Sequence, residues 1–211
     1  LVYSRATINK IGVLAQAYDV TVIVDQLYSR MLYGEEQYTH LRACEVKPKN
    51  LITIMGPSKT ESLSGFRLGV AFGTSTLIER MESLQAIVSL RASGYNQAAL
   101  NTWFEEPSQW LEKRIKEHEI IRDELIQVFK SANLLTVTPQ AGSYLFPQLP
   151  ELTVSLHDFV RLLRIQANVI VTPGSEFDPK CQDSIRLNFS QDYSNAVLAA
   201  KRIVKMVEIY S

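Results

Sequence analysis

The hydrophobic positions near the start of the chain recur with the period of an α-helix. Ser4 stands just before them and can accept a hydrogen bond from the first turn of such a helix. The apolar positions of the predicted face are Ile8, Ile11, Leu14, Ala15 and Tyr18. The sequence therefore predicts an amphipathic helix that begins beside Ser4.

Three runs of β-branched and other apolar residues come next, and none of them alternates with polar residues. They are VTVIVD at 20–25, LITIM at 51–55 and RLGVAFG at 67–73. A run without alternation is typical of a strand buried on both faces, as in a parallel sheet that helices cover. Helical periodicity returns at 74–90. We therefore expect an α/β arrangement in this half of the chain.

The second half of the chain changes from one long helix to short strands. An apolar stripe against a charged face predicts a helix over 108–133, and a last helix is expected over about 194–210. Between them lie the short runs LLTVTP, GSYLFP, NVIVTPG and SIRLNFS. This order predicts an α/β part at 1–107, a connecting helix at 108–133 and a smaller α+β part at 134–211.

Charge and composition then narrow the function. The 22 basic residues balance 22 acidic ones, so nothing in the charge predicts nucleic acid or a lipid surface as a partner. No apolar run reaches the roughly 18 residues of a membrane span. Cys44 and Cys181 match no metal-ligand spacing, so no metal site is expected. Two thiols in a chain of this length favour a reducing compartment, and we expect a cytoplasmic protein.

The stretch MGPSKTESLSGFRLG, residues 55–69, holds a lysine between a Gly-Pro turn and an Arg-x-Gly sequence. Its SKT invites comparison with a phosphate-binding loop, which needs glycine directly before the lysine and again six places before it. Ser58 and Thr53 occupy those two positions. A nucleotide-binding loop of that type is therefore excluded.

Three charged side chains stand at the ends of the predicted strands. Asp25 and Lys59 each follow a buried run, at the carboxyl end where open α/β sheets gather their ligands, and Arg67 opens the third run. An aldehyde cofactor needs an amine to form a Schiff base, a carboxylate against its pyridinium nitrogen, and cations for its phosphate. One acid, one lysine and one arginine at neighbouring strand ends fit such a cofactor.

Five segments resemble those of one enzyme family, in the family's order. VIVDQLYSRMLY is similar to the D-x-x-Y segment of the class I/II aminotransferases, the fold-type-I enzymes that use pyridoxal 5'-phosphate. SKTESLSGFRLG resembles their S-K-x(5)-G-x-R-x-G lysine segment. PQAGSYLF, VTPGSEFDP and SIRLNFS are similar to their small-domain sequence. The resemblance implies an α/β fold of the type I transferases. It includes part of the large-domain, mainly parallel sheet at 1–107 and a small α+β C-terminal domain at 134–211.

The resemblance also implies roles for the residues that match the family's motifs. Lys59 would carry the cofactor as a Schiff base and, once freed, move the proton between the substrate carbon and the cofactor. Asp25 would pair with the pyridine nitrogen, and Tyr28 would hydrogen-bond the phenolic oxygen of the ring. Ser58 and Arg67 would hold the phosphate, the guanidinium in a bidentate manner.

For the substrate, the resemblance points to the second half of the chain. Arg186 in SIRLNFS would bind the α-carboxylate, which suits a planar guanidinium better than a lysine. Because Arg186 lies in an apolar strand, we expect an anionic partner to compensate its charge. The implied reaction moves an amino group from an amino acid to a 2-oxo acid. The family's dimers build each cofactor pocket from both subunits, so a homodimer is expected.

The sequence departs from the family's pattern at several points. Gln26 stands where glutamate is usual, and Gly56 stands where many members carry a hydroxyl residue, so one phosphate ligand is missing or comes from elsewhere. The family's glycine-bearing phosphate turn, its ring-stacking aromatic, its asparagine and its N-P-x-G turn are all absent. We therefore expect the chain to be the C-terminal part of a larger protein.

Other interpretations stay open at this level. A carbon–sulfur β-lyase or a pyridoxal-dependent oxidase would use the same lysine segment, and some bacterial regulators carry an aminotransferase-like domain as an effector module. Taken singly, Asp25 could cap a helix and Tyr28 could simply pack in the core. Phe177 could border the substrate entrance. His40, His118 and His157 form no ligand spacing and are assigned no role.

Overall fold

The computed structural model describes residues 1–211, which form two compact units, Leu1–Leu111 and Glu112–Ser211. Their assignment as a cofactor-binding domain and a smaller domain stays a prediction. No helix in either unit combines the length and the apolarity needed to cross a membrane.

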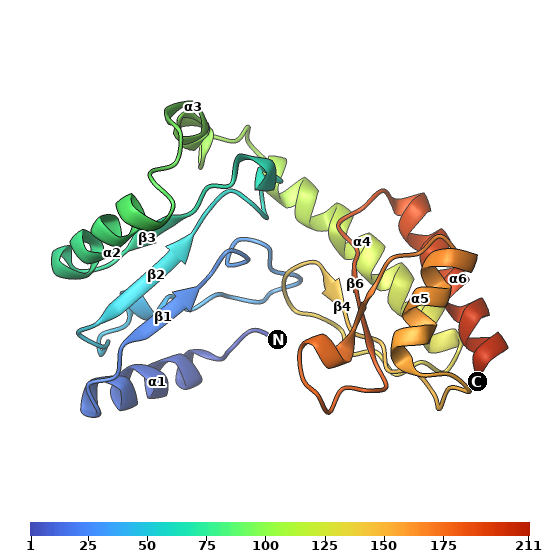
Figure 1. The fold of residues 1–211 in the computed structure, drawn as a ribbon. Helices are drawn as coiled ribbons and strands as arrows, with labels where there is room; N and C mark the ends of the chain where they lie inside the picture. The colour runs from blue at the N-terminus through green and yellow to red at the C-terminus, as the bar shows by residue number, and fades with distance from the viewer. The chain divides into compact units, whose positions relative to one another are not determined.

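The first unit is built on a three-stranded sheet with the strand order β1-β2-β3. Strand β1 (Val22–Asp25) runs parallel to β2 (Leu51–Met55), and their arrows point the same way in Figure 1. Strand β3 (Val70–Phe72) pairs with β2 in the antiparallel sense. The three predicted strands are thus confirmed, but the third runs against the parallel direction expected for it.

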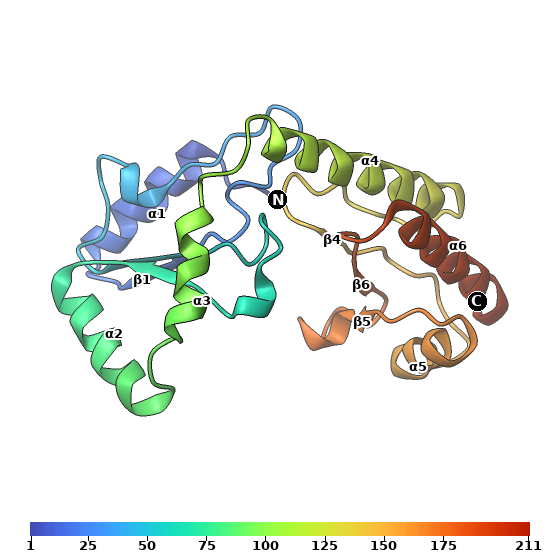
Figure 2. The same cartoon turned by 90° about the horizontal axis from the view of Figure 1, so that it is seen from above.

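Two longer helices accompany this sheet and lie on opposite faces of it (Figure 2). Helix α1 (Arg5–Ala17) begins as predicted, because the Ser4 hydroxyl accepts a hydrogen bond from the Thr7 amide at 3.1 Å. Helix α2 (Ser75–Val88) confirms the periodicity predicted over 74–90. The remaining short elements are α3 (Gly94–Ala98), η1 (Leu41–Ala43), η2 (Ser64–Phe66) and η3 (Ala99–Thr102).

Burial in this unit differs from the expectation drawn from its apolar runs. Strand β1 is not buried on both faces, since the Ile23 side chain is 62% exposed, and α2 has no buried residue. The enclosed residues Leu41, Cys44 and Leu51 form a small cluster under α1. Against it pack Ile8, Ile11, Val22 and Val24. Strand β2 differs, because its neighbouring residues Leu51 and Ile52, which point to opposite faces of the sheet, are both buried.

The second unit contains three helices and a second three-stranded sheet, which can be followed in Figure 1. Helix α4 (Trp110–Ser131) starts at the end of the first unit, and α5 (Leu156–Gln166) and α6 (Tyr193–Tyr210) follow. The strand order is β4-β6-β5, with both pairs antiparallel, for β4 (Tyr144–Leu145), β5 (Thr172–Pro173) and β6 (Ile185–Asn188). A short turn, η4 (Gly174–Glu176), follows β5.

One predicted strand of this unit is wrong. The run LLTVTP, residues 134–139, has no regular secondary structure, although Leu134 and Thr136 are buried. Leu135 accepts a backbone hydrogen bond from Gln148, but no ladder extends from it. Of the apolar residues in this run, Leu134 is buried, whereas Leu135 and Val137 are exposed. The run is therefore a loop that contacts the core through Leu134 rather than a strand.

Candidate active site

The carboxyl ends of β1 and β2 and the start of β3 place three of the predicted site residues at one edge of the sheet. Asp25 is the last residue of β1 and lies opposite Ile54 in the parallel register. Lys59 follows the end of β2 within one turn, and Arg67 precedes β3, whose start pairs with the end of β2 through Met55 and Val70. Because β1 and β2 are parallel and β3 is antiparallel, all three connections open at the same edge.

Asp25 presents an exposed carboxylate at this edge. Its Oδ1 accepts a hydrogen bond from the Leu27 amide at 3.3 Å, and the side chain forms no ion pair within the chain. Nearby, burial raises the pKa of the Tyr38 phenol, and the negative charge of Asp25 raises it further. Tyr38 is thus a neighbour of the carboxylate that the sequence did not reveal, because it lies in a loop without periodicity.

Gln26, which replaces the family's glutamate, is turned the other way and is buried. The backbone N–H of Gln26 donates to the Ile54 carbonyl at 3.0 Å, and the side-chain oxygen of Gln26 accepts a hydrogen bond from His40 Nδ1 at 3.2 Å. The His40 ring packs edge-on against Tyr38, with centroids 4.9 Å apart. His40, which the sequence left without a role, therefore anchors the loop of Tyr38 beside the end of β1.

Lys59 and Ser58 lie in the turn after β2 and are half-buried. The Lys59 Nζ lies 5.7 Å from the centroid of the Tyr28 ring. The Ser58 hydroxyl donates to the Leu68 carbonyl at 3.2 Å, which ties the turn to the segment before β3. The structure therefore brings Tyr28, Ser58 and Lys59 into one small region.

The absence of a hydroxyl residue at position 56 has a steric cause. A Cβ atom on Gly56 would lie 3.0 Å from the Leu68 carbonyl oxygen and 3.4 Å from the Leu27 side chain. A side chain at this position would require the neighbouring backbone of Leu68 to move by a few tenths of an ångström. Glycine fits here without that adjustment.

Arg67 lies at the same edge with its side chain exposed. Its backbone has a φ of 53°, in the left-handed region, and its guanidinium donates to the Ser64 carbonyl at 3.0 Å. It makes no ion pair within the chain. The left-handed conformation costs a non-glycine residue energy, and such strain is concentrated at functional sites.

The charged groups at this edge fit pyridoxal phosphate in number and sign. Asp25, Lys59 and Arg67 carry one negative and two positive charges, and none of them forms an ion pair with another residue of the chain. The cofactor would supply the matching partners, namely a pyridinium, an aldehyde carbon and a phosphate. The Ser58 hydroxyl oxygen, which donates to Leu68, can still accept or share a further hydrogen bond.

Arg186 belongs to the second unit, where β6 carries it. Its guanidinium carbon lies 4.4 Å from the centroid of the Tyr144 ring and 4.2 Å from that of Phe177, and Phe177 also packs edge-on against Phe146. The expected anionic partner is not found within the chain. Instead, two aromatic rings lie against the guanidinium, whose N–H groups form no hydrogen bond within the chain. Tyr144 was not singled out from the sequence.

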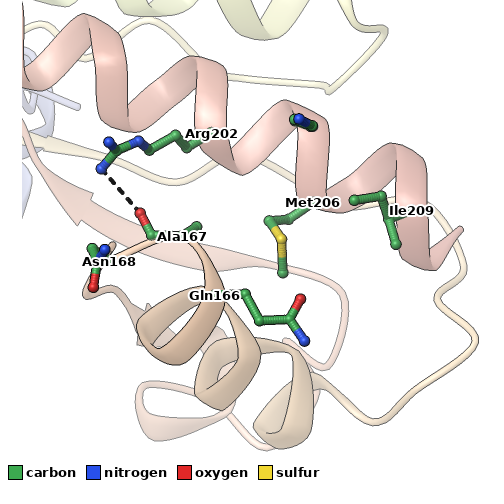
Figure 3. Close-up of a pocket in the computed structure, with 7 residues that line it drawn as sticks. Gln166, Ala167, Asn168, Arg202, Met206 and Ile209 are labelled. Carbon is green, nitrogen blue, oxygen red and sulfur yellow. Dashed lines mark hydrogen bonds between the residues drawn. The ribbon is translucent and has the colours of Figure 1, made fainter.

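A separate cavity of about 360 Å³ lies between the end of α5 and α6 and contains none of the predicted site residues (Figure 3). The Arg202 guanidinium donates to the Ala167 carbonyl at 3.1 Å across its mouth. Ala167 is the C-cap of α5, so this contact satisfies a helix-end carbonyl with a cation. The cavity is thus explained by the packing of two helices.

Known proteins resemble the chain over nearly its whole length. A crystal structure of an aspartate aminotransferase from Rhodobacter sphaeroides 2.4.1 is 58% identical, with a TM-score of 0.96, and the match covers 100% of this chain and 54% of that one. The putative aminotransferase YugH of Bacillus subtilis is 27% identical over 96% of this chain and 53% of its own length. An aspartate aminotransferase of Geobacillus stearothermophilus is 26% identical over 99% of this chain and 54% of its own.

These matches cover only about half of the length of the relatives. The fold is that of the type I pyridoxal-phosphate enzymes, as the sequence predicted. The sequence pattern of one family, Aminotransferase class I and II, matches residues 1–203. The chain therefore belongs to the class I and II aminotransferase family.

Proposed function

We propose that this chain carries the lysine-bearing part of a pyridoxal-phosphate-dependent aminotransferase, which moves an amino group from an L-amino acid to a 2-oxo acid. The observation that supports this most is the set of Asp25, Lys59 and Arg67 at one sheet edge, each without an ion-pair partner. These side-chain types match what pyridoxal phosphate requires, namely a carboxylate for its ring nitrogen, an amine for its aldehyde carbon and a cation for its phosphate. Several relatives are named aspartate aminotransferases, so aspartate is the first amino donor to assay.

Each predicted cofactor-binding residue has a separate role in this proposal. Bound pyridoxal phosphate supplies an electrophilic carbon for amines and a ring that accepts the electrons of the substrate's Cα–H bond. Lys59 holds the cofactor through its amine and moves the substrate proton. Asp25, at the end of β1, keeps the ring nitrogen protonated. Ser58 and Arg67 hold the phosphate, and Tyr28 hydrogen-bonds the phenolic oxygen from its position beside Lys59.

Arg186 binds the substrate α-carboxylate in this proposal. Its flat packing against Tyr144 and Phe177 limits rotation of the guanidinium, so its N–H edge is oriented before the substrate arrives. Such preorganisation lowers the entropy that binding must overcome. The aromatic contacts also shield the charge from solvent, which strengthens a bidentate contact with a carboxylate.

The experiment for the cofactor site is chemical trapping in the full-length protein loaded with pyridoxal phosphate. Borohydride reduction followed by peptide mapping is expected to place the pyridoxyl group on Lys59. Lys47 and Lys49, on the same unit but exposed, are the internal controls and should stay unlabelled. A label on any lysine other than Lys59 would contradict the assignment.

The role of Arg186 is tested with amino acids and matching amines that lack the carboxylate. Arg186→Ala should lose activity toward amino acids by about a hundredfold or more, as expected for a lost charged contact, and toward the amines far less. Arg161→Ala, which removes an exposed arginine of α5, is the matched control. Equal losses for both substrate classes would indicate a structural arginine.

Reaction type and assembly belong to the same proposal. A panel of amino acids with 2-oxoglutarate or pyruvate separates transfer from its alternatives. New amino acids indicate transfer, ammonia with pyruvate indicates β-elimination, and oxygen consumption indicates an oxidase. We further propose a homodimer in the cytoplasm, since the sites of symmetric dimers commonly draw on both subunits. Size-exclusion chromatography with light scattering checks the assembly.

A further inference from the structure

A cluster of one cation and two acids lies beside the lysine turn. Arg30, five residues beyond Asp25, donates through Nη1 to Glu61 Oε1 at 2.5 Å. Arg30 also forms a bidentate contact with Glu106. Its Nη1 donates to Oε1 at 2.8 Å and its Nη2 donates to Oε2 at 3.0 Å. The Phe104 ring covers its guanidinium, whose carbon lies 4.4 Å from the ring centroid. This cluster cannot be recognised from the sequence, because Glu61 and Glu106 lie 31 and 76 residues from Arg30.

This cluster differs from an ordinary surface ion pair in its burial. The side chains of Arg30, Glu61 and Glu106 are 19%, 7% and 13% exposed, whereas those of Arg91 and Glu82 are 72% and 55% exposed. Exposed pairs contribute little, but enclosed bidentate contacts hold their elements in a defined geometry. Glu61 Oε2 is enclosed and has no hydrogen-bond partner, so the position of Glu61 depends on Arg30.

Arg30 joins three segments, and two of them carry predicted cofactor-binding residues. Arg30 belongs to the loop that carries Asp25 and Tyr28, and Glu61 belongs to the turn of Lys59. A ligand-binding side chain keeps its geometry when its own support is fixed by further hydrogen bonds. Arg30 therefore restrains the two segments that carry Tyr28 and Lys59. The Lys59 Nζ lies 5.7 Å from the centroid of the Tyr28 ring.

We propose that Arg30 is a positioning residue for Lys59: by binding Glu61 and Glu106 together, it fixes the lysine turn against the loop of Asp25 and Tyr28. This inference rests on the function proposed above. The charges agree with it. The guanidinium of Arg30 lowers the pKa of Glu106 to about 2, while burial raises the pKa of Glu61. Glu106 is thus the main anionic partner of Arg30. Glu61 is the more buried carboxyl group, and its contact with Arg30 compensates its burial.

The test uses the full-length protein loaded with pyridoxal phosphate. Arg30→Met removes the charge and keeps a side chain of similar length. We expect kcat to fall by about tenfold or more, because small misplacements of a reacting group cost that much. KM should stay within about twofold, since substrate contacts are untouched. Arg30→Lys should restore part of kcat, because one ammonium can pair with only one of the two carboxylates at full strength.

A second readout does not depend on turnover. The visible absorption of the cofactor bound to Lys59 changes with pH, and the midpoint reports the electrostatic surroundings of the lysine. Removing the cation in Arg30→Met should move the midpoint to higher pH, because the remaining negative charge favours the protonated form. Glu106→Gln, which removes an anion but keeps the shape, should move it to lower pH. Both variants should lose kcat.

Arg91→Met is the matched control, because it breaks the exposed Arg91–Glu82 pair of the same unit. It should leave kcat and the midpoint unchanged. A folded, cofactor-loaded Arg30→Met protein with the wild-type midpoint and kcat would overturn the inference. If that variant fails to fold, Glu106→Gln decides by the same two measurements. A wild-type protein that shows no cofactor on Lys59 would refute the proposed function itself, before any variant is compared.

Discussion

The two units of this chain differ in how completely they enclose their own apolar residues. In the second unit, the rings of three phenylalanines are wholly buried, and aliphatic residues from α4, α5, α6 and the sheet surround them. These buried residues are Leu125, Phe129, Leu145, Phe159, Leu163, Ile185, Phe189 and Ile203. Both units also expose large apolar side chains, but the first unit exposes more of them, on β1, β3, α2 and the residues just after α2. They include Ile23, Phe72, Leu84, Ile87, Val88 and Leu90.

The difference shows that the two units are stabilised in different ways. The second unit buries a continuous core and satisfies the usual condition for an independent fold. The first unit encloses a smaller core and exposes more apolar surface, of the kind that other protein covers in a functional assembly. The predicted site residues Asp25 and Lys59 therefore lie in the unit that depends more on such cover.

The largest effect is expected when the units are separated. Residues 108–211, expressed alone, should unfold in one cooperative transition, because α4 and the whole enclosed core are retained. Residues 1–111 alone should bind a hydrophobic dye and aggregate, since large apolar side chains of β1, β3 and α2 stay exposed. Circular dichroism with urea and light scattering compares the two. A soluble and cooperative 1–111 fragment would show that the contrast between the units is wrong.

Local pattern gave the elements of both units, and long-range contacts explain where it failed. Ser4 followed by a helical period predicted the start of α1, because capping and periodicity are local. The unbroken apolar run of β1 wrongly predicted burial on both faces, because burial depends on which other segments reach the sheet. The loop at 134–139 failed for a related reason. Leu134 is buried there, but Leu135 and Val137 are exposed, and the run has no neighbouring strand to pair with.

The candidate site shows the same division. The residues of the lysine segment and of the D-x-x-Y segment could be named from the sequence because they lie in short, ordered motifs. Tyr38, His40 and Arg30 could not, because their contacts with Asp25, Gln26 and Glu61 join segments that are separated in the sequence. The assigned roles at the site stay predictions until the trapping experiment is done.

A smaller effect is expected from truncating one side chain in each unit. Phe159→Ala should lower the free energy of unfolding of the second unit by about 3–5 kcal/mol, because it leaves a cavity in a closed core. Ile87→Ala, at a side chain that is 82% exposed on α2, should change the stability of the 211-residue chain by less than about 0.5 kcal/mol. Urea unfolding measures both.

Repeating Ile87→Ala in the full-length protein tests whether other protein covers α2 there. If other protein covers α2 there, the same substitution should cost about 1 kcal/mol or more, in the range of a buried truncation. A cost that stays near zero in both settings would mean that the face of Ile87 is open to solvent. The apolar surface of the first unit would then need an explanation other than cover.

The smallest effect concerns the one histidine that the second unit encloses. His118 on α4 is buried, with Nδ1 donating to the Arg114 carbonyl at 2.8 Å and Nε2 accepting from the Ser190 hydroxyl at 2.8 Å. Burial lowers the pKa of His118 from its usual 6.5. As the pH falls below that value, the unfolded chain binds a proton that the folded unit binds only at lower pH. The free energy of unfolding therefore decreases as the pH falls from about 7.5 to about 5.

His118→Gln should remove that part of the pH dependence, while His157→Gln, at an exposed histidine of α5, should leave it unchanged. Urea unfolding of residues 108–211 at several pH values measures both slopes. An unchanged slope in His118→Gln would mean that His118 is protonated as readily in the folded unit as in the unfolded chain. The hydrogen bond between His118 and Ser190 would then be accessible to solvent, and the closed core of this unit would not include it.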